Sequence, residues 1–258
     1  MDFLRAAALG DVPHGFFGRS GPDGAQFDCG FSEQIDQAVA QQNRLSAAAT
    51  IQPPRALIMP DQIHSTDVLV VDAPFALDQR PKVDALVTNN RDLVIGIVTA
   101  DCAPVLLADQ VAGVVCGAHA GWRGAVGSTD TDDNGGPGIL ENAVEAMEQL
   151  GAERNRIVAA IGPCIAQQNY EVDAPFLANF DDADQGHFTE AGIRENVHRW
   201  HFDLPGYAAA RLASAGVGYV EVLDFDTYAH SDRYYSFRHA TRRKQPNFGR
   251  QISVIAAL

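Results

Sequence analysis

Three residues of this sequence carry side chains suited to holding one metal ion, namely His64, Cys102 and His119. Two imidazoles and one thiolate form a ligand set that leaves the fourth tetrahedral position of Zn²⁺ open, as in catalytic zinc sites. Zinc in such a site lowers the pKa of a bound water toward about 7. The same set holds copper when a weak axial methionine joins it, but the chain has only 3 Met residues and no His-x-His pair. Zinc is therefore the favoured metal, and copper is the alternative.

The stretch from Asp92 to Ser128 contains two of these ligands, and its apolar blocks predict how they are held. The blocks are short, rich in Val and Ile, and bounded by Gly, Pro or Asp, which is typical of buried strands. They cover residues 94–98, 105–108 and 114–118. We therefore predict strands on both sides of Cys102, with His119 directly after the third.

A hairpin between the second and third blocks sets the register of the two ligands. Residues 109–112 provide a four-residue connection with Gly113 behind it, which is a usual hairpin loop. Pairing Ala108 with Gly113 places Cys102 opposite His119, with Cβ atoms roughly 4.5–5.5 Å apart. That distance suits two ligands of one ion, whereas a different loop closure would shift the register.

The residues after His119 combine glycine with a cation where a strand ends. In residues 121–124, Gly-Trp-Arg-Gly, a turn would expose backbone N–H groups beside the Arg123 guanidinium, which suits phosphate. An ordinary tight turn with a solvated arginine is an equal alternative. Further arginines stand at Arg19 and in the C-terminal segment, where they complete an anion site or balance acidic neighbours. The C-terminal ones are Arg233, Arg238, Arg242, Arg243 and Arg250.

Composition limits the partners of the chain. With 258 residues and 46% hydrophobic content it can bury one sizeable core, and no linker divides it, so residues 1–258 are predicted to form one domain. A formal net charge of -14 argues against nucleic acid or an anionic membrane as partner. Arginines in a cleft still allow a small anionic substrate. No segment is typical of a signal peptide or a membrane span, so a cytoplasmic location is predicted.

The cysteines are too widely spaced in so large a chain to indicate a disulfide framework. They are Cys29, Cys102, Cys116 and Cys164. Cys116 lies within a predicted strand and is expected in the core. Cys164 follows a strand next to a turn, and the alternatives are a reactive thiol or, as is usual for a lone cysteine, an inert one.

Strands and helices interleave without strict alternation, which predicts a mixed-sheet α/β or α+β fold. Helices are predicted over residues 32–45, 140–150 and 205–215, and further strands over residues 56–59, 68–71, 84–88, 157–161 and 219–223. His64 falls at a strand edge in this scheme, where a lone histidine is usually a satisfied surface or core group, and the pair of Cys102 and His119 is what favours it as a third ligand. Residues 181–199 are polar without a clear pattern. The acidic stretch from Ser128 to Pro137 is predicted as an exposed loop, with a lid as the alternative.

Several motifs taken together resemble the laccase-domain family, also known as multicopper polyphenol oxidase-like proteins. They are Gln-Ile-His-Ser at Gln62, Thr-Ala-Asp-Cys at Thr99, His-Ala-Gly-Trp-Arg-Gly at His119, Ile-Gly-Pro-Cys-Ile at Ile161, Tyr-Glu-Val at Tyr170, and a closing Tyr-Ser-Phe-Arg. The resemblance implies a single α/β domain whose mixed sheets are sandwiched by helices. The sequence departs from the family pattern at three places. They are the acidic loop, Asp226 before Thr227 where relatives often have Cys, and Arg238-His239 where relatives have two arginines. These differences concern substrate preference and not the metal ligands.

The resemblance also implies a function. The matching His, Cys and His residues of the family bind zinc, and members are purine nucleoside phosphorylases that accept adenosine, inosine, guanosine and methylthioadenosine and also deaminate adenosine. Some relatives are named peptidoglycan editing factors. The partners are then a purine nucleoside and phosphate, and the chain is a monomer or homodimer. Catalytic roles are expected for His64, Cys102, His119 and Arg123, and contacts to substrate or phosphate for Arg19, Ser65, Gly121, Gly124, Cys164 and Arg238.

In the expected phosphorolysis, phosphate attacks the ribose C1′ while a polar group protonates the departing purine. Arg123 and the 121–124 backbone hold the phosphate, with Arg19 or Arg238 assisting, and positioning and charge stabilisation supply most of the rate. Deamination would use hydroxide generated by zinc at the purine C6.

Other classes of function remain open on the same residues. Cys102 and His119 are also the nucleophile and base of a metal-free cysteine hydrolase. Copper in place of zinc would give a polyphenol oxidase. A zinc-bearing binding module without turnover is the remaining alternative.

Overall fold

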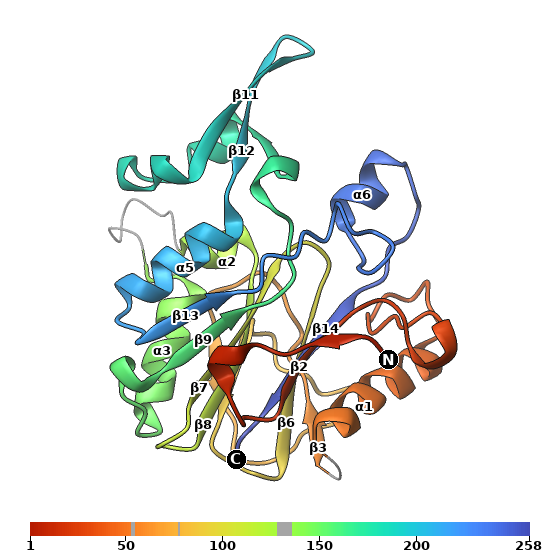
Figure 1. Ribbon diagram of the computed structural model, residues 1–258, viewed down its shortest axis with the longest axis vertical. Coiled ribbons are helices and arrows are strands. Elements are labelled where there is room, and N and C mark those ends of the chain that lie inside the picture. The colour runs from red at the N-terminus through yellow and green to blue at the C-terminus, as the bar shows by residue number, and fades with distance from the viewer. Residues whose placement is uncertain (53–54, 77, 128–135) are drawn as a thin grey trace.

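The computed structural model describes residues 1–52, 55–76, 78–127 and 136–258. Two mixed β-sheets pack face to face, and helices cover both outer faces (Figure 1). The central strands β6 (Leu93–Thr99), β7 (Ala103–Asp109) and β8 (Val114–Ala120) are buried at every residue. A strand covered on both faces needs apolar side chains in both directions, which is why these segments are continuous apolar runs. The three predicted strands in this region are confirmed.

One sheet has five strands and the other has six. The five-stranded sheet has the order β1 (Phe3–Leu4), β2 (His14–Phe17), β14 (Gln251–Ala256), β6 and β3 (Ala56–Ile58). The six-stranded sheet has the order β13 (Tyr219–Val222), β9 (Val158–Ile161), β7, β8, β5 (Ala85–Thr88) and β4 (Val68–Val70). Each contains parallel and antiparallel pairs.

The two sheets share an apolar interface in which β6 lies over β8. Ile95 and Ile97 of β6 belong to the same buried cluster as Leu106 and Val115 of the other sheet. At Gly117 in β8 a Cβ atom would lie 2.8 Å from Ile95 Cγ2, so glycine is what permits this close approach. Leu93, Ile95 and Ile97 therefore face the interface, while alternate residues of β6 face a helix.

Helices cover the outer faces. α1 (Gln37–Ile51) packs Ala47 and Ala48 against the five-stranded sheet, and α3 (Ile139–Gln149) and α5 (Leu204–Ser214) pack on the six-stranded sheet. The predicted fold class, a single α/β domain of mixed sheets sandwiched by helices, is confirmed. The first predicted helix was placed too early. It begins after Asp36, whose carboxylate accepts hydrogen bonds from the N–H groups of residues 38 and 39.

A third, antiparallel sheet stands above the other two, in the order β10 (Glu171–Asp173), β12 (Val197–Phe202) and β11 (Phe188–Arg194), and its β11–β12 hairpin projects from the molecule (Figure 1). No strand was predicted over residues 181–199, where the structure has this hairpin. The hairpin has few buried residues, so its strands lack the alternation that would reveal them. Its base packs on an aromatic group of Phe176, Phe180, Phe188, Phe202 and Tyr207.

Short helices complete the described chain. They are α2 (Trp122–Val126), α4 (Ala174–Leu177), α6 (Phe237–Arg242) and the 3-10 turns Ala7–Leu9, Pro22–Gly24, Arg154–Arg156, Gln167–Asn169 and Asp182–His187. Of the predicted acidic loop from Ser128 to Pro137, residues 128–135 lie outside the described residues. Within the described ranges, no helix has both the length and the apolar character to cross a membrane.

The register predicted for the β7–β8 hairpin is wrong by two residues. Ala108 pairs with Val115 rather than with Gly113, and Pro104 pairs with His119. The loop still has four residues, but it is 110–113, because Asp109 remains in the strand and its carboxylate accepts hydrogen bonds from two loop N–H groups. Gly113 supplies the left-handed conformation (φ 69°) that closes this loop.

Candidate metal and substrate site

The three predicted metal ligands come together from three separate elements. His64 lies in the loop between β3 and β4 rather than at a strand edge, Cys102 lies in the β6–β7 turn, and His119 lies in β8. One ligand atom from each residue lies within 4.8 Å of the others, and Cys102 Sγ is 3.8 Å from His64 Nε2. Sulfur and nitrogen ligands of a tetrahedral zinc are about 3.6 Å apart, so these side chains lie close to the spacing that zinc requires.

Gly121 makes room for this cluster. With the observed register, Cys102 comes level with Gly121, and His119 lies two residues away on the same face of the sheet. A Cβ atom at Gly121 would lie 2.8 Å from His64 Cδ2 and 3.2 Å from Cys102 Sγ. Side chains of a strand alternate between the two faces of the sheet, so a register error of two residues leaves each side chain on its predicted face. The prediction that Cys102 and His119 meet therefore survives the error.

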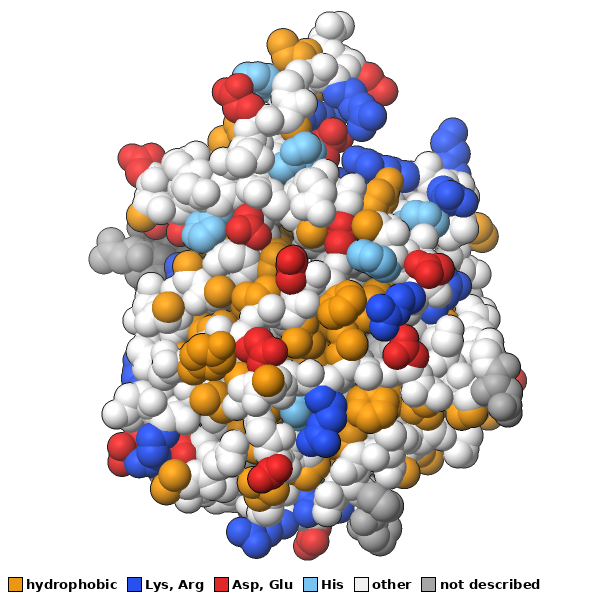
Figure 2. All heavy atoms as spheres, in the orientation of Figure 1, with side chains coloured by type: hydrophobic (Ala, Val, Ile, Leu, Met, Phe, Trp, Pro, Cys, Tyr) orange, Lys and Arg blue, Asp and Glu red, His pale blue; other side chains and the backbone are white. Residues whose placement is uncertain are grey.

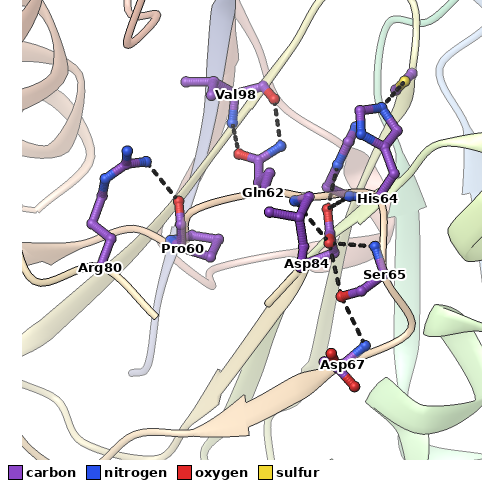
Figure 3. A network of polar contacts seen from close by, with 11 residues as sticks. Pro60, Gln62, His64, Ser65, Asp67, Arg80, Asp84 and Val98 are labelled. Carbon is purple, nitrogen blue, oxygen red and sulfur yellow. Dashed lines mark hydrogen bonds and ion pairs between the residues drawn. The ribbon is translucent and has the colours of Figure 1, made fainter. Parts of the chain in front are cut away.

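Asp84, which immediately precedes β5, orients both histidines. Its carboxylate has no exposed surface and lies 2.8 Å from Nδ1 of His119, so His119 presents Nε2 toward the cluster. The same carboxylate accepts hydrogen bonds from the backbone N–H groups of Ile63, His64 and Ser65 and from the Ser65 hydroxyl (Figure 3). These bonds hold His64 in a left-handed conformation with φ 63°. One buried carboxylate thus fixes two ligands that lie far apart in sequence.

The charges of the cluster favour a thiolate. Burial raises the pKa of Cys102, but His119 and His64 outweigh burial and lower that pKa to about 6. Burial lowers the pKa of His119, and Cys102 and Asp84 outweigh it and raise that pKa to about 9. Without metal, the pair is therefore a thiolate beside an imidazolium at neutral pH. A metal ion that binds here displaces the imidazolium proton.

Asp101, beside Cys102, joins the β6–β7 turn to α6. It is buried, has φ 84°, and accepts hydrogen bonds from Thr227 Oγ1 at 2.7 Å and from the Arg238 N–H at 2.6 Å. Burial raises the pKa of Asp101. This link holds α6 over the cluster.

Two cavities open on either side of the cluster and share His64, Ala100, Cys102 and Phe237 in their walls. The first, of about 550 Å³, is also lined by Phe31, Ser32, Asp61, Gln62, Arg80, Val98, Thr99, His119, Phe248 and Arg250. The second, of about 530 Å³, has an aromatic wall and several charged groups, including Trp122, Arg123, Tyr170, Glu171, Asp173, Phe176, Arg199 and Arg238. Both volumes are in the range of small-molecule sites.

Two of the predicted residues, Arg123 and Arg238, line the second cavity. Arg123 is exposed and stands over the Trp122 ring, and Arg238 stands over the Tyr170 ring and donates to the Glu171 carbonyl at 2.8 Å. Ser65 and Arg123 line a neighbouring pocket of about 410 Å³ together with His64.

The glycines of the motif have a packing role in this structure. Gly121 faces the ligands, and a Cβ at Gly124 would lie 2.8 Å from the Ser65 carbonyl oxygen. Absence of side chains at these positions therefore lets α2 approach the His64 loop closely.

Two predicted residues lie apart from the cluster. Arg19 donates to the Ser231 carbonyl at 2.6 Å, stacks on Tyr235 and lines a separate pocket of about 330 Å³. Cys164 is buried in the core, where burial raises its pKa. Exposed Lys and Arg residues gather on the surface at the C-terminal end of α6 (Figure 2), and they line neither cavity at the cluster; they are Arg242, Arg243 and Lys244.

Sequence reasoning missed Asp84, Asp101 and the aromatic wall of the second cavity. Asp84 was assigned to a strand, and its partners lie 19 to 35 residues away in sequence. The available signal was an acidic residue directly before an otherwise apolar strand. A buried carboxylate is stable only when other groups donate hydrogen bonds to it or carry an opposite charge. An acidic residue at such a position therefore predicts donors from elsewhere in the chain.

The family model described as "Multi-copper polyphenol oxidoreductase laccase" matches residues 14–258. The chain belongs to this family. Among curated relatives of this laccase family member, the purine nucleoside phosphorylase ORF3 of Streptomyces griseus is 38% identical over 205 residues, which is 79% of this chain and 77% of the relative. The adenosine deaminase RL5, from an unknown prokaryotic organism, is 36% identical over 209 residues, which is 77% of this chain and 74% of the relative. Relatives with these names indicate an enzyme.

Solved structures support the fold of this family member. The Neisseria meningitidis protein NMB0706 is 27% identical, has a TM-score of 0.81, and is matched over 100% of this chain and 99% of that protein. The Bacillus licheniformis protein YfiH has a TM-score of 0.82 at 24% identity over 99% of this chain and 96% of that protein, a likeness that bears on the fold alone.

Proposed function

We propose that this laccase family member is a cytoplasmic, zinc-dependent purine nucleoside phosphorylase that also deaminates adenosine. Its substrates are adenosine, inosine, guanosine or methylthioadenosine with phosphate, and residues 1–258 act as one domain. The observation that carries the proposal is the cluster of His64, Cys102 and His119, of which His64 and Cys102 line two cavities of substrate size and His119 lines the first. The names of curated relatives support the substrate class.

Zinc would be held by the two imidazoles and the thiolate, and Asp84 keeps the His119 ring in the orientation that presents Nε2. When bound, zinc supplies a Lewis acid that polarises a substrate atom or activates water near neutral pH. The low pKa of Cys102 supports metal binding, because the thiolate and not the thiol is the ligand.

The second cavity suits the nucleoside. Trp122, Tyr170 and Phe176 provide an aromatic wall against which a purine packs, and their rings are fixed by mutual contacts. Glu171 and Asp173 provide carboxylates that accept hydrogen bonds from ribose hydroxyls. Arg123 and Arg238 belong to the substrate-binding set with Ser65, Gly121 and Gly124. The proposal leaves out Arg19, which lines a separate pocket, and Cys164, which is buried in the core.

In phosphorolysis a phosphate oxygen forms a bond to C1′ while the bond from C1′ to the purine nitrogen breaks. The electron pair of the broken bond stays on the purine, which takes up a proton, and the products are ribose 1-phosphate and the free base. The chain contributes by positioning both substrates and by placing cationic groups near the phosphate.

Incubation of the protein with adenosine, with and without phosphate, tests this function. Separation of the products should show inosine alone without phosphate, and adenine together with inosine or hypoxanthine when phosphate is present. Production of neither base nor inosine by protein with stoichiometric zinc would refute the proposal.

Two other functions each have an observation in their favour. The family description favours copper-dependent oxidation of polyphenols, which predicts oxygen uptake with catechols that stops when copper is removed. The thiolate–imidazolium pair favours a metal-free cysteine hydrolase, which stoichiometric zinc in the purified protein would exclude. Peptidoglycan editing, named for some relatives in the resemblance, predicts turnover of a peptidoglycan fragment instead of a nucleoside.

A further inference from the structure

Tyr170 lines the second cavity and places there a hydroxyl group that no described residue engages. Within the described ranges of the chain, this hydroxyl makes no hydrogen bond. The side-chain atoms of these ranges that lack both a hydrogen bond and accessible surface belong to Arg44, Thr99, Glu141, Arg199 and Tyr235. The Tyr170 hydroxyl is not one of them, so it keeps accessible surface and is open to a ligand.

Packing fixes the ring that carries this hydroxyl. The Tyr170 ring meets Phe176 and Phe202 edge to face, with a distance of 5.8 Å between ring centroids in both pairs. The Arg238 guanidinium covers the ring at 5.3 Å from its centroid and is itself held by the Glu171 carbonyl. A donor on so constrained a ring is oriented before a substrate arrives, as stabilisation of a transition state requires.

The charged groups around the hydroxyl all belong to the second cavity. Burial raises the pKa of Tyr170, the charges of Cys102 and Asp101 add to this rise, and Arg238 and Arg123 oppose it. These four residues line the same cavity, which places the hydroxyl where they converge, next to a metal ligand. Because the pKa is raised, the phenol stays protonated and remains a donor at neutral pH.

The other polar groups of this cavity are suited to other roles. Glu171 and Asp173 pair with arginines at 3.4 and 3.6 Å, and carboxylates accept hydrogen bonds instead of donating them. Arg123 is exposed, so water screens its charge. Among the described residues of the cavity wall, Tyr170 has the only hydroxyl, and the Trp122 indole is the other uncharged donor.

We propose that the Tyr170 hydroxyl donates a hydrogen bond to the departing purine during phosphorolysis. This role rests on the proposed function, since it concerns the bond between C1′ and the purine. As that bond breaks, its electron pair leaves negative charge on the five-membered ring of the purine, and N7 carries part of it. The phenol O–H donates to N7, and the purine then takes up its proton from water. The hydrogen bond strengthens as charge develops in the transition state, so Tyr170 acts on kcat.

Steady-state kinetics of Tyr170→Phe with guanosine and phosphate test this role. The variant keeps the ring and its packing and removes only the hydroxyl. The kcat should fall about 100-fold, because a preorganised donor to the developing charge is lost. The KM for guanosine should stay within about twofold of wild type, since the aromatic wall is unchanged.

The same kinetics with 7-methylguanosine show whether the hydroxyl acts on the leaving group. Its purine is positively charged, so it departs as a neutral base and gains no negative charge. Its N7 carries a methyl group and accepts no hydrogen bond. Tyr170→Phe should therefore reach at least the wild-type kcat with 7-methylguanosine. An equal loss of kcat with guanosine and 7-methylguanosine would mean that the hydroxyl only supports the cavity, and it would overturn the proposed role.

Two further variants serve as controls. Tyr219→Phe removes a hydroxyl from the exposed edge strand β13 and should match wild type with both nucleosides. Trp122→Phe removes the other uncharged donor of the cavity, and its kcat should change by the same factor with both nucleosides. A loss confined to guanosine in Trp122→Phe, with none in Tyr170→Phe, would make the indole the donor and overturn the role of Tyr170.

Product analysis with guanosine distinguishes failure of this role from failure of the proposed function. If wild-type protein with stoichiometric zinc forms no guanine from guanosine and phosphate, both fail. If wild type forms guanine and Tyr170→Phe has the wild-type kcat, the proposed function stands and the role of Tyr170 is overturned. A loss of about 100-fold in Tyr170→Phe that is confined to guanosine supports both.

Discussion

Two carboxylates without exposed surface lie at the two ends of the β7–β8 hairpin, and only one of them contacts the candidate metal ligands. At the closed end, Asp109 accepts hydrogen bonds from Val111, Ala112 and Glu153 N–H groups and pairs with Arg156 at 3.0 Å. At the open end, Asp84 accepts three backbone N–H groups of the His64 loop and contacts His119.

The cationic partner makes the difference between the two ends. Burial raises the pKa of each carboxylate, but the hydrogen bonds and charges of its partners outweigh burial and lower that pKa below its ordinary value. Both carboxylates are therefore ionised at neutral pH. Arg156 has a fixed charge, and its contact with Asp109 closes a loop. His119 has a second ring nitrogen that stays available after the first has contacted Asp84, so the same buried-carboxylate arrangement presents a ligand. Substitutions at matched positions can break or sharpen this comparison.

The largest effect is expected at the cysteines of the hairpin. Cys102→Ala should lower zinc affinity by more than about 100-fold and abolish turnover, because it removes a ligand rather than a supporting group. Cys116→Ala, in the middle of β8, should keep one equivalent of zinc and lose about 1 kcal/mol of stability. Metal analysis after dialysis and chemical denaturation measure the two quantities. Equal zinc retention by both variants would place the metal elsewhere.

The next effect concerns the two carboxylates themselves. Asp84→Asn and Asp109→Asn should each lower the free energy of unfolding by about 2 kcal/mol, because the amide group turns a donor toward backbone donors. Asp84→Asn alone should also weaken zinc binding about 10- to 100-fold, since His119 loses its orienting partner. Competition with a chelator measures the affinity. A similar loss of zinc affinity in Asp109→Asn would show that the two ends do not differ as described.

A smaller effect is expected in the pH dependence of thiol reactivity in metal-free protein. Because the pKa of Cys102 lies near 6, its alkylation rate should rise as pH passes through about 6 and level off above. Burial raises the pKa of the other thiols, Cys29, Cys116 and Cys164, so they should remain unmodified in the folded protein. Mass spectrometry of the alkylated peptides separates the sites. A rate for Cys102 that keeps rising up to pH 9 would contradict the influence of the histidines.

The smallest effect is expected at the two glycines that end the hairpin. Gly113→Ala should cost about 1 kcal/mol because of its positive φ, with no change in zinc binding, as open space surrounds this position. Gly121→Ala should weaken zinc binding, because the added Cβ meets His64 and Cys102. Thermal denaturation with and without zinc compares them. A zinc-induced shift of the thermal midpoint that stays at the wild-type value in Gly121→Ala would show that the ligands do not need this space.

The sequence predicted the elements whose pattern is local. Strands β6, β7 and β8 and helices α3 and α5 were anticipated because continuous apolar runs and helical spacing are visible within a few residues. The β11–β12 hairpin was missed since its strands are largely exposed, and β14 was not assigned although it is buried throughout. The hairpin register was off by two because Asp109 looked like a loop residue until its hydrogen bonds were seen.

The candidate site was predicted only in part, for the same physical reason. The side chains of the three predicted ligands are of types that bind metal ions, so the sequence alone indicates a metal site. The structure brings these residues together, namely His64, Cys102 and His119. Asp84 and Asp101 are ordinary residue types whose importance comes from tertiary neighbours on other elements. Arg19 carried the right charge but lies in a separate pocket, because charge alone does not place a side chain.

A zinc titration of metal-free protein tests the central claim most directly. With adenosine and phosphate present, formation of adenine should rise in proportion to added zinc and stop rising at one equivalent per chain. Cys102→Ala should show no rise at any zinc concentration. Adenine formation at the full rate in metal-free protein, or a rise in Cys102→Ala equal to wild type, would contradict a zinc-dependent reaction at the cluster of His64, Cys102 and His119.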